Sequence, residues 1–147
     1  MLSTFEACIR VGRIARAQLM LKVITEIIDR ESPLLLGAHN MFLKALLGRA
    51  VAEKSKDSEG IRIFFGWYED QMKRILELKG DATTFALLLE GSVILSEEDP
   101  ALGKRYIAQY VEQWKSMNMD IVRVLELQIL SDAHVLKIAQ VRKPCFI

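Results

Sequence analysis

Residues 81–117 read DATTFALLLEGSVILSEEDPALGKRYIAQYVEQWKSM, and the fold class follows from the spacing of their apolar side chains. Asp81 precedes a long apolar run, and its carboxylate can accept the free amides of a first helical turn. Pro100 suits the first position of a second helix, where a missing amide hydrogen costs little. Large side chains then recur at steps of 4, 4, 4 and 3 residues, which is helical spacing, at Leu102, Tyr106, Tyr110, Trp114 and Met117. The stretch predicts helices at 82–95 and 100–117.

The same spacing extends over the rest of the chain, and strand-like alternation is scarce. Apolar residues predict further helices at 2–11, 14–28, 38–52, 61–79, 120–128 and 132–141, with Gly12 at the first turn and Pro33 breaking the pattern before the third helix. These helices form pairs, in approximate repeat units 2–33, 36–80, 81–118 and 119–142. Stacked antiparallel pairs that bury each other's apolar faces form an α-solenoid. We therefore predict a single all-α helical-repeat domain, with a non-repeating helix bundle as the alternative.

Composition supports a packed core and gives no global attraction to a charged partner. Of 147 residues, 51% are hydrophobic, and 20 Lys and Arg against 19 Asp and Glu leave a net charge of +1. Binding to nucleic acid must therefore come from a local patch. The longest apolar runs are far short of the roughly 20 residues of a membrane span, so no membrane partner is expected. Cys8 and Cys145 lie at opposite ends of the chain, which suits a reducing compartment such as the cytoplasm, the nucleus or a matrix.

No set of side chains predicts catalysis, a metal or a cofactor. His39 and His134 lie 95 residues apart with no cysteine near either, and His39 is expected to pack or to cap a helix. The glycines form no phosphate-binding loop, and the serines have no patterned base partner. The sequence predicts no catalytic residues, no metal ligands and no cofactor.

Three short strings resemble a known family. They are TFEACIRVGRIARA at 4–17, GAHNMFLKAL at 37–46 and DATTFALLL at 81–89. Phe5, Gly12 and Ala17 occupy positions that pentatricopeptide repeats favour, and the His39-Asn40 pair follows Phe5-Glu6 by 34 residues. Over residues 2–125 the chain resembles the N-terminal pentatricopeptide-like region of fungal mitochondrial RNA polymerases, which are single-chain, phage-like enzymes.

The resemblance implies a non-catalytic accessory module that lies outside the polymerase domain, near the path of emerging RNA. Its implied partners are RNA, a transcription-factor protein and the rest of the polymerase chain, and its implied location is the mitochondrial matrix. Residues 1–30 read as an ordinary amphipathic helix rather than a transit peptide. We therefore expect the chain to be a fragment whose address lies upstream.

Contact with RNA would depend on local clusters of cations. Arginine forks match phosphate oxygens, and residues at steps of three can share one edge of a helix pair. The alternative is that each of these cations simply belongs to a solvated helix face. The candidates for contact with RNA or a partner protein are Arg10, Arg13, Arg16, Lys104 and Arg105, together with Asn40.

Asn40 is the one candidate for base reading. In pentatricopeptide repeats a polar residue after the early aromatic helps to read a base, and here that position holds Glu6, Asn40 or Ala86. An amide both donates and accepts, whereas alanine does neither and glutamate would repel phosphate. We therefore expect backbone contact rather than sequence-specific reading.

A second hypothesis is a tetratricopeptide-like scaffold that binds a protein and has no RNA role.

Trp67 lies off the main apolar stripe of its helix and is the aromatic expected to be exposed. Apolar side chains at both ends, at 1–2 and 144–147, predict marginal stability or self-association of the isolated chain.

Overall fold

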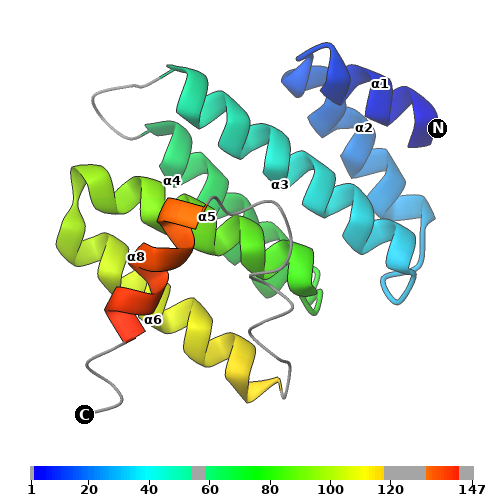
Figure 1. Cartoon of the computed structure of the whole chain (residues 1–147). Helices are drawn as coiled ribbons and strands as arrows, with labels where there is room; N and C mark the ends of the chain where they lie inside the picture. Colours follow the sequence, from blue (N-terminus) through cyan, green and yellow to red (C-terminus); the bar gives the residue numbers. More distant parts are fainter. Residues whose placement is uncertain (1, 54–58, 118–131, 143–147) are drawn as a thin grey trace. The chain divides into compact units, whose positions relative to one another are not determined.

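The computed structural model describes residues 2–53, 59–117 and 132–142, and these parts are helical with no strand (Figure 1). None of the described helices is long and apolar enough to cross a membrane. The prediction of an all-α chain of paired helices is confirmed. The elements, in chain order, are α1 (Leu2–Arg10), α2 (Ile14–Ile27), α3 (Pro33–Glu53), α4 (Glu59–Gly66), the π-helix η1 (Trp67–Ile75), α5 (Ala82–Glu98), α6 (Pro100–Ser116) and α8 (Asp132–Arg142).

The chain divides into two compact units, Met1–Lys79 and Gly80–Ile147. This division falls where the second predicted repeat unit ends and the third begins. The predicted helix at 120–128 lies outside the described residues, whereas the predicted helix at 132–141 is present as α8. The finer assignment of four repeat units stays a prediction.

In the first unit, α1 and α2 form a tight pair that packs against α3. The turn between them needs Gly12, whose φ of +81° lies in the left-handed region that favours glycine. The sequence placed the start of α3 at Ala38, which is wrong, because the helix begins at Pro33. Proline does not break this helix, since the first helical position needs no amide hydrogen.

The single helix predicted at 61–79 is in fact α4 followed by the π-helix η1. The amide of Leu76 donates to the carbonyl of Gln71 at 3.0 Å, five residues back rather than four, so the turn is wider. The buried face of this segment repeats every four residues, through Tyr68 and Met72 of η1 and Leu76 directly after it. Ile75, predicted to lie in that stripe, is 48% exposed.

In the second unit, α5 and α6 form a hairpin, and α8 packs on both. A single residue joins the two helices. The Asp99 amide closes α5 by donating to the Leu95 carbonyl at 2.9 Å, and its carboxylate opens α6 by accepting from the Leu102 amide at 3.2 Å. Pro100 takes the predicted first position of α6.

The core face of α6 differs from the predicted stripe. Leu102 and Tyr106 are only half-buried, and the buried residues are Gly103, Ile107, Tyr110, Val111 and Trp114. The reason is Gly103: a Cβ there would lie 2.4 Å from Cα of Ser96, so the two helices meet at the glycine. A glycine carries no apolar signal, which is why the spacing of large side chains misplaced this face.

Asp81 caps α5 as predicted, and its removal gives a first testable expectation. Its carboxylate accepts from the Thr84 amide at 3.0 Å, and the Thr84 hydroxyl accepts from the Asp81 amide at 3.1 Å, forming a capping box. We expect Asp81→Ala to lower the free energy of unfolding by about 1 kcal/mol, as measured by urea titration. Glu97→Ala, an exposed acid in the same helix, is the control and should change it by less than about 0.5 kcal/mol. Equal effects would contradict the capping role.

A basic cleft as candidate nucleic-acid interface

Three of the candidate arginines meet where α1 turns into α2. Arg10 is the last residue of α1, Arg13 immediately precedes α2, and Arg16 lies in the first turn of α2. The left-handed turn at Gly12 brings these positions together. All three side chains are exposed. The first turn of α2 carries no acidic residue, and the side chain of Arg13 makes no capping bond to it.

These arginines line a cleft of about 1170 Å³ whose other wall is α3. Helix α3 adds two further cations, Lys44 and Arg49. Sequence analysis missed both, because Lys44 and Arg49 are five residues apart, about 140° around the helix, and no single-face pattern links them. The described residues that line the cleft are Glu6, Ile9, Arg10, Gly12, Arg13, Ile14, Ala15, Arg16, Met41, Lys44, Ala45 and Arg49.

The charge of the cleft is strongly one-sided although that of the whole chain is not. Among the residues that the structure describes, five basic side chains line it against one carboxylate, that of Glu6, whereas the chain as a whole carries only +1. Concave surfaces lined by one sign of charge concentrate counter-ions of the other sign. Between the cations, Ile9, Ile14 and Met41 are half-buried and give the cleft an apolar lining. The arrangement can hold an anionic chain that also carries apolar surface.

The comparison with known families decides what this chain is related to. The family model described as RPO41-like, TPR repeats matches residues 1–146. The chain belongs to this family. It corresponds to the N-terminal region of mitochondrial RNA polymerase, so the resemblance drawn from the three sequence strings is confirmed at that level. No curated protein and no solved structure matches the chain.

The other candidate residues of this RPO41-like chain lie outside the cleft lining. Asn40 is only 6% exposed within α3, so its amide is not displayed for base reading on the surface. Lys104 and Arg105 are exposed on the first turns of α6, in the second unit. Of the six candidate residues, the three arginines meet in the cleft and Asn40 is buried. Lys44 and Arg49 are cleft cations that were not among the candidates.

The first unit also holds a groove of about 720 Å³ between α2 and η1, with His39 and Trp67 in its lining. Trp67 is not freely exposed as the sequence suggested. It is half-buried, and its indole N–H donates to His39 Nδ1 at 3.2 Å. Its ring also packs against Phe42, with centroids 4.6 Å apart.

His39 is a buried, neutral link between three helices. The Thr25 hydroxyl donates to the Leu21 carbonyl at 2.7 Å, so it accepts from His39 Nε2, 3.1 Å away. With Trp67 donating to Nδ1, every polar atom of the ring has a partner in the neutral form. Burial lowers the pKa of His39 from 6.5 to about 4. The expectation that His39 packs is confirmed.

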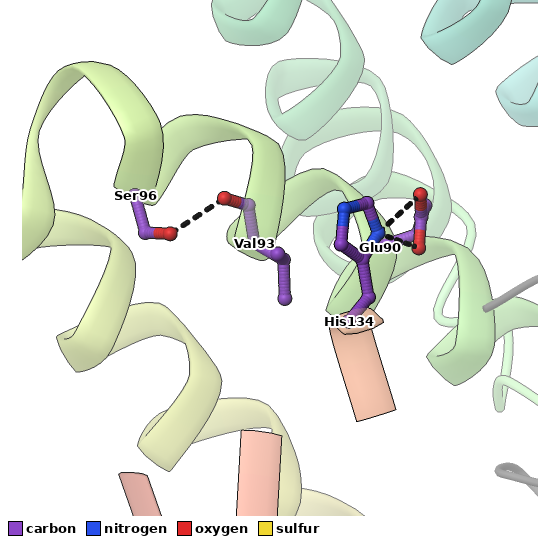
Figure 2. Close-up of polar contacts among 4 residues, drawn as sticks. All are labelled: Glu90, Val93, Ser96 and His134. Carbon is purple, nitrogen blue, oxygen red and sulfur yellow. Dashed lines mark hydrogen bonds and ion pairs between the residues drawn. The ribbon is translucent and has the colours of Figure 1, made fainter. Parts of the chain in front are cut away.

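His134 also has a partner, in the second unit. Its Nδ1 lies 2.7 Å from both carboxylate oxygens of Glu90, and this contact, drawn as dashed lines in Figure 2, ties α8 to α5. Beside this contact the Ser96 hydroxyl donates to the Val93 carbonyl at 2.5 Å. In the parts of the chain that the structure describes, no three His, Cys, Asp or Glu side chains come together as a metal site.

Proposed function

We propose that this chain is a non-catalytic accessory module of a mitochondrial RNA polymerase in the mitochondrial matrix, and that its basic cleft holds RNA through the phosphate backbone. Membership of the RPO41-like family supports the parent enzyme and the compartment. The observation that carries the RNA role is the excess of five cations over one carboxylate among the described residues that line the cleft.

The chemistry of the cleft favours phosphate contact without base reading. Arginine forks bind phosphate oxygens in pairs, and cations on two facing walls can contact successive phosphates of one strand. The apolar lining suits ribose and base surfaces. With Asn40 buried, the described part of the cleft lining offers only cations, one carboxylate and apolar or small side chains. The module would therefore hold RNA of any sequence near the polymerase.

Removing the arginine edge is expected to weaken RNA binding. For single strands the slope of log K against log salt is about −0.7 per phosphate contact, so an Arg10/Arg13/Arg16→Ala variant should lose a slope of about 2. At roughly 100 mM salt we expect a ten- to hundredfold loss of affinity. The measurement is fluorescence anisotropy with a labelled single-stranded RNA of mixed sequence.

The control removes three cations of the same unit outside the cleft lining, in an Arg62/Lys73/Arg74→Ala variant. Lys73 lies 3.6 Å from Glu69, and Arg74 lies 3.6 Å from Asp70. This variant has the same net charge as the arginine variant and should bind RNA within about threefold of the parent chain. Equal losses in the two variants would show that only net charge matters, and undetectable RNA binding would reject the RNA role.

The groove between α2 and η1 favours a second candidate function, the tetratricopeptide-like scaffold with no RNA role. Leu19 and Ile75 leave apolar surface exposed along its walls. Such grooves accept the apolar face of a helix or peptide. The two functions separate cleanly: retained capture of a mitochondrial transcription factor without measurable RNA affinity would favour the scaffold.

A further inference from the structure

Most cations of the basic cleft have no carboxylate paired with them. In the described part of the chain no ion pair involves four of the five, which are Arg10, Arg13, Arg16 and Lys44. By contrast, Lys73 on η1 lies 3.6 Å from Glu69. Unpaired charges on a concave surface attract anions more strongly than paired ones, because no internal partner neutralises them. The cleft therefore has charge available for an anionic ligand.

Lys44 is the one amine among the described cations of this cleft. The other four are arginines, whose guanidinium stays protonated and does not act as a nucleophile. The neutral form of a lysine amine does attack carbonyl carbon. Lys44 is exposed on α3, so solvent and ligands reach it. The cleft thus presents one nucleophilic amine within a set of phosphate-binding groups.

We propose that Lys44 is an acylation site, and that the basic cleft draws the acyl donor, an acyl coenzyme A thioester, to this amine. Coenzyme A carries a pyrophosphate and a third phosphate, which suit arginine forks. Its thioester arm and acyl group are uncharged, and the half-buried Ile9, Ile14 and Met41 lie between the cations. The cleft volume of about 1170 Å³ exceeds the roughly 300–1,000 Å³ of pockets that hold drug-sized ligands, so a molecule of this size can enter.

The reaction transfers the acyl group from sulfur to nitrogen. The ammonium of Lys44 first gives a proton to solvent, and the resulting amine attacks the carbonyl carbon of the thioester. A C–N bond forms, the C–S bond breaks and the thiolate leaves. A second proton passes from the nitrogen through solvent to the thiolate. The products are a lysine amide and the free thiol of coenzyme A, with no oxidation or reduction.

Proximity to the arginines should set Lys44 apart from other exposed lysines. Lys22 is exposed on α2 and lies outside the described cleft lining. Glu26 follows it by four residues, one turn along the same helix. Clefts lined by one sign of charge raise the local concentration of an oppositely charged molecule about tenfold or more. An anionic acyl donor should therefore react faster at Lys44 than at Lys22.

Acylation of Lys44 would also regulate RNA binding, a consequence that rests on the proposed function. The amide has no charge, so the acylated cleft keeps four of its five described cations. For one lost phosphate contact the slope of log K against log salt should fall by about 0.7, and the affinity at roughly 100 mM salt should fall about fivefold. Bound RNA should in turn cover Lys44 and slow its acylation.

The test exposes the whole chain to acetyl coenzyme A at low salt and mildly alkaline pH, and follows each lysine by mass spectrometry of its peptides. We expect the initial rate of acetylation at Lys44 to exceed that at Lys22 about tenfold. In the Arg10/Arg13/Arg16→Ala variant the rate at Lys44 should fall to near that at Lys22. The control variant of the same net charge, which lacks three cations outside the cleft lining, should keep the full preference. Circular dichroism confirms that both variants remain folded.

A second acyl donor separates recognition of coenzyme A from the intrinsic reactivity of the amine. S-acetyl-N-acetylcysteamine carries the same acetyl thioester without a nucleotide or a phosphate, so the arginines give it no advantage. With this donor Lys44 and Lys22 should react at similar rates. Raising the salt concentration should abolish the preference seen with acetyl coenzyme A, because salt screens the attraction between exposed charges.

Three results would overturn the proposal. They are equal rates at Lys44 and Lys22 with acetyl coenzyme A, a preference that survives in the arginine variant, and a preference that persists with the uncharged donor. Competition with single-stranded RNA separates this proposal from the RNA role. Protection of Lys44 but not of Lys22 would support both. Rapid acetylation of Lys44 that RNA does not slow would support the acylation site and count against the RNA role.

Discussion

Replacing Gly103 by alanine is expected to lower the free energy of unfolding of the second unit by about 3 kcal/mol. The added Cβ would lie 2.4 Å from both Cα and Cβ of Ser96 and 2.7 Å from its backbone nitrogen. These distances are far inside van der Waals contact, and the opposing atoms belong mainly to the backbone of α5. No side-chain rotation relieves the overlap, so α5 and α6 must separate and loosen the core around Trp114.

The measurement is native-state hydrogen exchange of the α5 and α6 amides, which reports on this unit alone. The control is Gly48→Ala in α3, followed by hydrogen exchange of the α3 amides, because a Cβ at Gly48 meets no heavy atom within 4 Å. There alanine should raise stability by about 0.5–1 kcal/mol, since it is the better helix former. The same substitution is thus expected to have opposite signs at the two glycines. A neutral or stabilising Gly103→Ala would disprove the close helix contact.

Acidification from pH 7 to pH 4 is expected to cost the first unit about 3 kcal/mol through His39 alone. The pKa of His39 is about 4 in the folded chain and 6.5 for the ordinary side chain. Between these values the unfolded chain binds a proton that the folded chain does not, so stability falls as pH falls. Above pH 6.5 the full contribution is present, and below pH 4 no further loss comes from this group.

The test compares the pH dependence of unfolding in the parent chain and in His39→Gln. Carboxylates titrate over the same range, so the difference between the two curves isolates the histidine. Glutamine removes the titrating group while keeping a hydrogen-bonding side chain near Trp67 and Thr25. The curves should converge by about 3 kcal/mol from pH 7 to pH 4. Parallel curves, or a His39 resonance that titrates near 6.5, would contradict the buried neutral ring.

Much of the helical plan could be predicted because local chemistry sets it. Gly12 marks a left-handed turn, Asp81 caps its own helix and Pro100 begins the next one, and each signal acts within a few residues. The start of α3 was misplaced because Pro33 is compatible both with a helix break and with a first helical position. Its neighbours could not distinguish these two roles.

What escaped prediction depends on contacts between helices. The π-helix begins at Trp67, whose indole donates to His39, 28 residues away along the chain, and no local pattern predicts that contact. One side of the cleft could be predicted from the sequence, because its three arginines are close along the chain. Lys44 and Arg49 join them only when α3 packs beside α1 and α2.

The one-residue connection at Asp99 also bears on how quickly the second unit can form. Because the same residue ends α5 and begins α6, the two helices meet without a loop whose closure would cost chain entropy. Their contacts join residues close in sequence, beginning with Ser96 and Gly103. Folding rates rise as contacts become more local. The hairpin can therefore assemble early and offer α8 a finished surface on which to dock.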